Sequence, residues 1–331
     1  MIGAHFTARR HPEIHVSSLS PTAKAQLQIH FCVVLWGFTA ILGKMISLPA
    51  LPLVWWRMLL VVAALALLPR AWRGLRVLSP RLILAYAGIG ALVALHWLTF
   101  YGAIKLANAS VAATCMALAT PFTALVEPAL ARRPFSGREL ALGIAVLPGV
   151  ALIVGGVPDA MRIGIAVGAL SAFFVALFGS LNKRLVHHGD PLTVTGLELG
   201  SGALTLTLLA PWMPMLFPSF AGDLFVLPDA RDAVLLLALS LLCTLLPFSL
   251  SLVALRHMSA FAAQLAINLE PVYAIVLAAL LFGEQRELTA TFYVGVAIIL
   301  AALFVHPLIS RTKRLSQPEL LATAEAKSSV E

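Results

Sequence analysis

Four ionisable side chains lie inside long apolar runs of the sequence. Arg57 lies in ALPLVWWRMLLVVAALALLP (residues 50–69), and His96, Glu198 and Glu270 lie in the runs LHWLTFY, GLELGSG and NLEPVY. Because a charge is costly in hydrocarbon, ionisable residues within a membrane face protein or a water-filled cavity. A guanidinium binds a carboxylate, and a carboxyl group binds a cation or carries a proton. The four residues predict a polar binding cavity inside a membrane protein.

Arg57 and His96 each have a functional and a structural interpretation. Arg57, about 10 Å inside its run at ~1.5 Å per residue, is either a handle for a substrate carboxylate or a tether between helices. His96 is either a ligand contact or a hydrogen-bonded core residue. Its neighbours Trp97, Phe100 and Tyr101 form an aromatic wall that fits a pocket and equally fits plain packing. We expect Arg57, His96 and Tyr101 to line the cavity.

Glu198 lies on a helix face that is rich in small residues. Gly196, Gly200 and Gly202 surround it, and small residues let a neighbouring helix approach closely. A carboxylate on such a face needs a partner or water, and Arg57 is one candidate partner. We expect Glu198 to face the cavity.

Glu270 is the deepest charge, near the middle of the run 259–282. The adjacent Pro271 has no backbone N–H and frees the carbonyl of Ile267, so the helix should be kinked there. Broken helices occur at membrane depth only where they face protein or a water-filled cavity, and Asn268 is expected to line that cavity with Glu270. As a proton carrier, Glu270 would be neutral while the empty protein reorients and ionised when it binds a cationic group. The alternative is a neutral, hydrogen-bonded acid without a role in binding.

No catalytic or nucleotide-binding motif is recognisable. The sequence has no HExxH pair, no nucleophile elbow, and no Gly-rich phosphate loop or Walker motif. Cys32, Cys115 and Cys243 lie in apolar runs without metal-site spacing, which is typical of packing residues. We therefore expect no catalytic residues, no metal and no cofactor.

The composition indicates an integral membrane protein. Of the 331 residues, 60% are hydrophobic and 11% are charged, whereas a soluble domain carries roughly 25% charged residues. The net charge of +8 is spread thinly between apolar runs, which argues against a nucleic-acid partner and for charges that orient loops. The expected partners are the lipid bilayer and a small-molecule substrate.

Ten runs are long enough to cross a membrane, since a helix needs about 20 apolar residues to span a ~30 Å hydrocarbon layer. The expected fold class is an all-α integral membrane protein with ten transmembrane helices. The runs are 27–47, 50–69, 82–104, 109–131, 138–157, 162–185, 191–213, 232–256, 259–282 and 289–309.

The basic residues orient these spans. With the N-terminus inside, 17 of the 23 Lys and Arg residues fall in inner segments, four in outer segments, and Lys44 and Arg57 in the membrane. Cytoplasmic loops carry the excess of Lys and Arg. Both termini are therefore expected to be cytoplasmic, with residues 1–26 and 310–331 as tails and the inner (cell) membrane as the location.

The chain also contains an internal repeat. The matched pairs, with their offsets, are Lys44 and Lys183 (139), Lys105 and Arg256 (151), Pro121 and Pro271 (150), and Gly143 and Gly295 (152). The repeat gives two five-helix halves, 27–157 and 158–309, and an odd number of spans inverts the second half around a central cavity. Inverted repeats are typical of alternating-access transporters, whose site lies where the halves meet. Pro121 and Pro271 are the expected helix kinks.

Two stretches of the repeat resemble a known family. ALRHMSAFAAQLAINLEPVYAIVLAALLFGEQ (254–285) and its weaker partner AIKLANASVAATCMALATPFTALVEPAL (103–130) resemble the two EamA domains of the drug/metabolite transporter superfamily, and WGFTAILGK (36–44) resembles the opening of the first domain. The resemblance covers about residues 27–305. It implies a ten-helix bundle that moves small metabolites, often amino acids or similar compounds, frequently by export. The apolar loop 212–231 departs from the compact pattern of that family.

The leading functional hypothesis is a secondary transporter that moves a small polar metabolite by alternating access, with export as the expected direction. A proton-independent facilitator or channel-like permease is the first alternative, and an intramembrane enzyme is the second. Two inverted halves in one chain favour a carrier, whose halves rock around a central site, over a channel. Without a nucleotide site, transport would run down a gradient of substrate, ion or proton, and Glu270 is the candidate for proton coupling.

Overall fold

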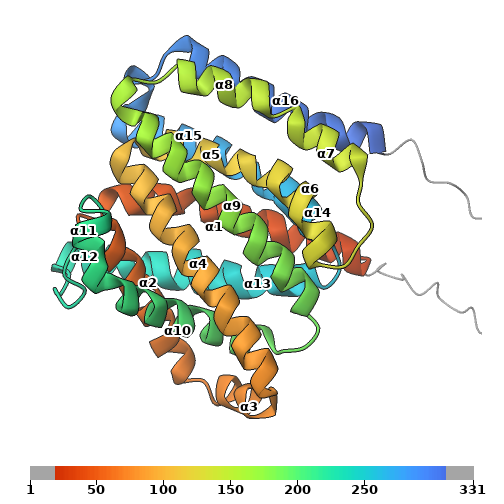
Figure 1. Ribbon diagram of the computed structural model, residues 1–331, viewed down its shortest axis with the longest axis vertical. Coiled ribbons are helices and arrows are strands. Elements are labelled where there is room, and N and C mark those ends of the chain that lie inside the picture. Colours follow the sequence, from red (N-terminus) through yellow and green to blue (C-terminus); the bar gives the residue numbers. More distant parts are fainter. Residues whose placement is uncertain (1–18, 311–331) are drawn as a thin grey trace, which may run out of the picture.

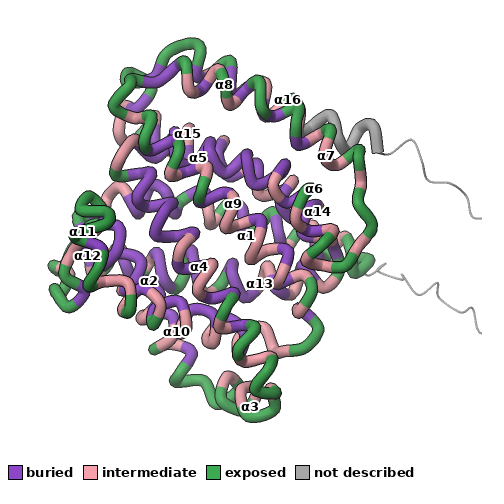
Figure 2. Tube along the Cα trace, viewed as in Figure 1, coloured by how far each residue is buried: buried purple, intermediate pink, exposed green. Residues whose placement is uncertain are grey.

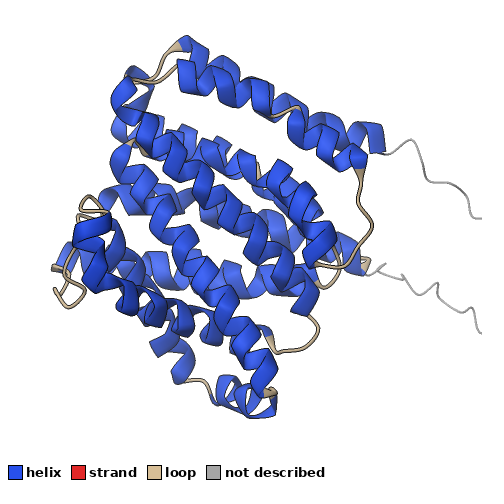
Figure 3. Ribbon diagram, in the orientation of Figure 1, coloured by secondary structure: helices blue, strands red, loops and turns tan. Residues whose placement is uncertain are grey.

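The computed structural model describes residues 19–310, with side chains through Ala302. These residues form helices joined by loops and contain no strands (Figure 3). The helices are α1 (Pro21–Met45), α2 (Ala50–Ala66), α3 (Pro69–Val77), α4 (Pro80–Leu106), α5 (Ala109–Cys115), α6 (Ala119–Leu130), α7 (Gly137–Ile144), α8 (Leu147–Gly155), α9 (Arg162–Leu185), α10 (Pro191–Leu209), α11 (Met213–Leu216), α12 (Ala230–Leu237), α13 (Leu246–Leu255), α14 (Ala260–Ile267), α15 (Glu270–Phe282) and α16 (Ala290–Ser310). The expected C-terminal tail and most of the N-terminal one lie outside the described residues.

Most of the expected spans are present as long apolar helices. Eight helical segments in the described part of the chain are long and apolar enough to cross a membrane, and α2 with α3 makes a ninth if the bent pair counts as one span. The last run contains a shorter apolar helix over Ala290–Ala302. The all-helical membrane fold is confirmed, and the count of ten spans stays a prediction.

Polar side chains next to the apolar runs begin many of the helices. The side chain of such an N-cap residue accepts a hydrogen bond from a backbone N–H that the first turn leaves unpaired. The N-caps that accept this bond are Ser20, Ser79, Asn108, Ser136, Asp190, Asp229 and Ser259. Nine of the ten observed starts lie within two residues of the expected ones. The exception is α1, which begins at Pro21 rather than at residue 27 because Ser20 caps it there.

The helices run between two faces of the bundle. We call the face where α1 begins and α16 ends the termini face, and the opposite face, which holds residues 213–230, the loop face (Figure 1). Neighbouring helix ends are hydrogen-bonded on both faces. At the termini face, Tyr86 Oη donates to the Leu185 carbonyl (2.9 Å); at the loop face, Ser47 Oγ donates to Asp232 (2.6 Å).

Buried residues concentrate in the middle of the bundle (Figure 2). α8 and α16 lie side by side along one edge (Figure 1). They approach most closely at Gly149 and Gly295, where a Cβ on either residue would lie 2.6 or 2.5 Å from the carbonyl oxygen of the other. Glycines commonly permit such close crossings between membrane helices.

Three long segments are interrupted along their length. A 3₁₀ turn (η1, Met116–Leu118) separates α5 from α6, a π-helical segment (η4, Ala238–Leu245) separates α12 from α13, and two residues separate α14 from α15. Pro121 and Pro271 lie in the first turns of α6 and α15. Asn268 Nδ2 donates to Thr120 Oγ1 (2.6 Å), so the breaks before α6 and α15 are in direct contact.

The expected span 50–69 ends early. α2 stops at Ala66, and α3 begins at Pro69 at an angle of 92° to it. Proline has no backbone N–H and restricts the residue before it, so it does not continue a helix from the preceding turn. Residues 69–77, expected largely as a loop, are therefore a short helix that lies across the end of α2.

The apolar segment 217–229 folds back over the loop face. The carbonyl of Phe220 accepts a hydrogen bond from Leu51 N–H (3.1 Å), and Trp56 Nε1 donates to the Val226 carbonyl (3.1 Å). The Phe220 ring packs on Gly102, where a Cβ would lie 2.4 Å from it. This segment covers the loop-face ends of α2 and α4.

Candidate functional site

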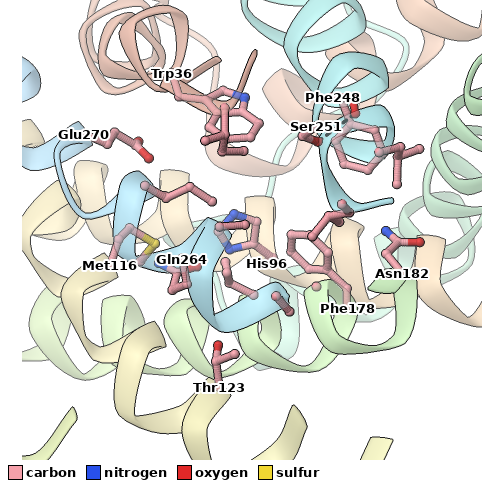
Figure 4. A pocket seen from close by; sticks show the side chains of 18 of the residues that line it. Trp36, His96, Met116, Thr123, Phe178, Asn182, Phe248, Ser251, Gln264 and Glu270 are labelled. Carbon is pink, nitrogen blue, oxygen red and sulfur yellow. Dashed lines mark hydrogen bonds between the residues drawn. The ribbon is translucent and has the colours of Figure 1, made fainter. Parts of the chain in front are cut away.

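A cavity of about 120 Å³ lies in the centre of the bundle. Its walls come from α1, α2, α4, α6, α9, α13, α14, α15 and the η1 turn, and most of them are apolar or aromatic, including Trp36, Phe178 and Phe248 (Figure 4). Ligand pockets commonly combine such walls with a few polar groups. The polar side chains here are Thr39, Arg57, His96, Thr123, Asn182, Ser251, Gln264 and Glu270.

The cavity extends from the centre of the bundle toward the termini face. It reaches from Arg57 and Glu270 to Leu255, the last residue of α13, and to Ala260, the first residue of α14. None of its lining residues within the described chain comes from a loop-face helix end. The site is therefore closer to the termini face than to the loop face.

Arg57 is fixed at the cavity by groups from other helices. Its Nε donates to Thr244 Oγ1 (2.6 Å), and its Nη1 donates to Tyr101 Oη (2.8 Å). The guanidinium carbon lies 3.8 Å from the centre of the Trp97 ring, which is a cation–π contact. Nη2 makes no hydrogen bond to any described residue. One edge of the guanidinium is therefore left for a ligand.

The two partners of Arg57 are themselves held in place. Thr244 lies in η4 and donates its own hydroxyl hydrogen to the Leu239 carbonyl (2.6 Å). Tyr101 is fully buried, and its ring packs on Gly43, where a Cβ would lie 2.1 Å from it. Since Tyr101 is not among the lining residues, it positions Arg57 from behind.

Glu270 lines the same cavity and is unpaired. It is the first residue of α15, and its carboxylate makes no hydrogen bond or ion pair with any described residue. The unpaired N–H groups of a first helical turn favour a negative charge. Glu270 and Arg57 interact electrostatically but form no direct ion pair. One cationic and one anionic group thus face the same space.

His96 contributes a polar edge between these groups and the end of α9. Ser171 Oγ donates to the His96 carbonyl (2.8 Å), so the His96 Nδ1–H donates to Ser171 Oγ (2.8 Å) in the arrangement that satisfies both groups. This tautomer leaves Nε2 as an acceptor with no partner among the described residues. Figure 4 shows the His96 ring beside Gln264, with Glu270 and Asn182 at opposite ends of the group.

Three residues expected in the cavity do not line it. Tyr101 lies behind Arg57, Asn268 bonds to Thr120, and Glu198 is fully buried. Glu198 accepts one hydrogen bond, from Asn182 Nδ2 (3.2 Å), and its Oε1 has no partner in the described structure. The proposed Arg57–Glu198 pair is wrong, because the two side chains point to different helices. Asn182, rather than Glu198, faces the cavity.

The sequence analysis did not identify several of the residues that line the cavity. Phe248, Ser251, Leu252 and Leu255 line the cavity from α13. Their spacing of three and four residues places them on one face of a helix. That spacing was a usable signal, but the surrounding residues are equally apolar, so the sequence does not single out this face.

A carboxylate cluster closes the loop-face ends of α1, α5 and α15. Glu284 has no exposed surface and accepts hydrogen bonds from Lys44 Nζ (2.6 Å), from Ser110 Oγ (2.5 Å) and from the N–H groups of Ala109 and Ser110 (3.2 and 3.0 Å). We call Lys44, Ala109, Ser110 and Glu284 the loop-face cluster. It joins the start of α5 to the ends of α1 and α15.

A second carboxylate cluster lies at the termini face. Glu127, near the end of α6, accepts hydrogen bonds from the N–H groups of Ala260 and Phe261 (2.8 and 2.9 Å) at the start of α14. Arg133 lies 3.1 Å from Glu127 and also pairs with Glu139. We call Glu127, Arg133, Ala260 and Phe261 the termini-face cluster. Arg133 is therefore the basic partner of Glu127.

Comparison with known proteins identifies the family to which this chain belongs. The sequence profile of the EamA-like transporter family matches residues 24–155 and 162–306. The chain belongs to the EamA-like transporter family. The two matched segments make the protein a multi-pass membrane transporter with two EamA units.

The fold of this EamA-like transporter also occurs among solved structures. A structure titled "Crystal structure of protein" aligns with 87% of this chain and 98% of its own chain, with a TM-score of 0.62 and 18% identity. At this identity, the likeness supports the fold alone. A comparison with curated protein sequences finds no match.

Proposed function

We propose that this EamA-like transporter is a secondary carrier for a small polar metabolite, an amino acid or a related compound, which binds in the central cavity. One observation carries the proposal: the free guanidinium edge of Arg57 and the unpaired carboxylate of Glu270 face one space. The carboxylate of a zwitterion would bind Arg57, and its ammonium group would bind Glu270. His96 Nε2 and Gln264 would accept and donate further hydrogen bonds.

The proposed mechanism is alternating access by ten spans in two inverted halves. The positions of matched residues support the inversion: Lys105 Nζ donates to the Ile46 carbonyl at the loop face (2.7 Å), and its counterpart Arg256 donates to the Val186 carbonyl at the termini face (3.2 Å). In the proposed orientation, both termini are cytoplasmic in a cell (inner) membrane. The cavity then lies toward the cytoplasm, which is the arrangement that loads a substrate for export.

Glu270 is the proposed coupling residue for protons. Substrate and proton would compete for one carboxylate, since an ionised Glu270 binds the ammonium group and a protonated Glu270 does not. The competing mechanism is facilitated export without proton coupling, in which Glu270 only binds substrate. The two mechanisms differ in their response to an imposed pH gradient.

Counterflow of labelled amino acids into proteoliposomes tests the binding site. Arg57→Gln should raise the half-saturating concentration of a carboxylated substrate about 10- to 100-fold, as expected for the loss of a hydrogen bond to a charged group. The effect on the amide analogue should be much smaller. Arg184→Gln, at the exposed end of α9, is the control and should change neither value. Equal losses for acid and amide would leave Arg57 as a tether only.

The pH-gradient experiment uses the same proteoliposomes. The wild-type protein should accumulate substrate when a pH gradient is imposed, and Glu270→Gln should retain substrate exchange but lose this accumulation. An indifferent wild-type protein, or a Gln variant that still follows the gradient, would exclude Glu270 as the coupling residue while leaving the binding site intact.

A further inference from the structure

An apolar groove lies outside the central cavity, between α2, α3 and α10. Its volume is about 240 Å³, and its walls include Val62, Leu65, Trp72, Leu75 and Leu197. The 92° bend between α2 and α3 creates it, because α3 lies across the end of α2 instead of extending it. In Figure 1, α3 projects beyond the end of α10 at the edge of the bundle.

α3 is fixed in this position by several contacts. Arg70 Nη2 lies 2.6 Å from Asp190, the N-cap of α10, and Thr193 Oγ1 donates to the Ala71 carbonyl (3.2 Å). Gly74 packs directly on Thr193, where a Cβ would lie 2.0 Å from its Oγ1. The contacts between α3 and α10 therefore hold the walls of the groove in place.

Glycines on α10 keep the groove open. A Cβ on Gly202 would lie 2.8 Å from the Gly90 carbonyl, so Gly202 serves close packing against α4. A Cβ on Gly196 or Gly200 would meet only the side chains of Leu65 or Val62, at 3.4 and 3.8 Å. Helix packing does not require these two glycines, and both line the groove. Larger side chains at these positions would fill it.

The segment that forms one side of the groove is rich in arginine. Residues 69–81 contain four arginines and no Asp or Glu. Arg70 is paired with Asp190, whereas Arg73, Arg76 and Arg81 are exposed and form no ion pair or hydrogen bond with any described residue. Arg73 and Arg76 directly follow the groove residues Trp72 and Leu75. Long arginine side chains reach along an apolar surface to place the charge at its rim.

We infer that this groove binds an anionic phospholipid. One acyl chain would lie along Val62, Leu65 and the bare α10 surface at Gly196 and Gly200, and the phosphate would bind Arg73 and Arg76. Charge complementarity selects this occupant: a short amphipathic helix with arginines and an exposed Trp72, lying across the end of a membrane span, matches the headgroup region of an anionic bilayer. The site is separate from the transport cavity and does not depend on the substrate.

Native mass spectrometry of the purified full chain tests the charged half of the site. Dioleoylphosphatidylglycerol should bind at least about fivefold tighter than dioleoylphosphatidylcholine. The double variant Arg73→Gln with Arg76→Gln should remove this difference. Arg138→Gln with Arg184→Gln, which removes two exposed charges from the same face, should keep it. Equal affinities of the wild-type protein for the two lipids, or equal losses in both double variants, would overturn the inference.

A glycine substitution tests the apolar half. Gly200→Leu fills the groove and should weaken phosphatidylglycerol binding about tenfold with every arginine retained. Gly88→Leu, at an exposed α4 position with nothing within 4 Å of its Cβ, is the matched control and should bind like the wild type. Undiminished binding to Gly200→Leu, or displacement of the lipid by excess inorganic phosphate, would show that no acyl chain occupies the groove.

Discussion

The loop-face and termini-face clusters use the same chemistry at opposite ends of the bundle and differ in what they join. Each places a fully buried carboxylate, Glu284 or Glu127, on the first N–H groups of a helix. The basic partner of Glu284 is Lys44, 240 residues away in the chain, whereas the partner of Glu127 is the nearby Arg133. The loop-face cluster therefore ties distant helices together, and the ion pair at the termini face is local.

This difference matches the position of the cavity. The cavity reaches Ala260, which belongs to the termini-face cluster, but none of the loop-face cluster residues lines it. The segment 217–229 adds a further cover at the loop face. The loop-face end of the bundle is therefore covered by this segment and tied together by the long-range Lys44–Glu284 ion pair.

Removal of the two carboxylates should have unequal effects. Glu284→Ala removes the acidic partner of Lys44, which has no other one among the described residues. The free energy of unfolding should therefore fall by about 3 kcal/mol, as for a broken buried pair. Glu127→Ala leaves Arg133 paired with Glu139 and should cost about 1–2 kcal/mol. Unfolding of both purified variants in one detergent measures the difference, and equal losses would contradict the comparison.

A pH titration should affect the loop-face cluster. Burial alone would raise the pKa of Glu284, but the hydrogen bonds from Lys44 and Ser110 outweigh it and hold the pKa below its usual 4.5. A carboxyl group with a depressed folded-state pKa stabilises the protein fully above its unfolded-state pKa, and this contribution is lost as the pH falls through the folded-state pKa.

The part of the unfolding temperature that depends on Glu284 should therefore be constant above about pH 5 and fall below about pH 4. Glu284→Gln should lack much of that fall. A Gln variant with the full wild-type acid dependence would place the responsible carboxylate elsewhere.

The smallest expected effect is the coupling energy within each ion pair. A double-mutant cycle on Lys44 and Glu284 should give about 1 kcal/mol, because Glu284 is buried and only 31% of the Lys44 side chain is exposed. The corresponding cycle on Arg133 and Glu127 should give about 0.5 kcal/mol, because Glu139 still binds Arg133 after Glu127 is removed. A larger coupling at the termini face would contradict the assignment of the stronger ion pair to the loop face.

Helix boundaries were largely predictable because local signals set them. A polar N-cap beside an apolar run fixes a start, and Pro69 stops α2. The bend between Ala66 and Pro69 was missed, since hydropathy alone does not separate a span from a helix lying across its end. The chemical nature of the cavity was also accessible from the sequence, because Arg57, His96 and Glu270 are too polar for lipid.

The partners of the buried polar groups were not predictable. Arg57 bonds to Thr244, 187 residues away, and Asn268 bonds to Thr120, 148 residues away. Such pairs depend on the rotation of each helix about its own axis, which apolar membrane helices encode only weakly. The wrong pairing of Arg57 with Glu198 has this cause. Arg57 and Glu198 were matched because they lie at similar depth in the two halves, but the rotation of α10 directs Glu198 toward Asn182.

The π-helical segment η4 has a consequence for how this helix diverges between related chains. A π-turn contains one residue more than the α-helical turn it replaces, so it corresponds to a single-codon insertion. Deleting one residue within Ala238–Leu245 would restore a regular helix and rotate its two ends by about 100° relative to each other. Either Thr244 would leave Arg57, or Phe248 and Ser251 would leave the cavity. One inserted codon thus decides which side of this helix lines the cavity.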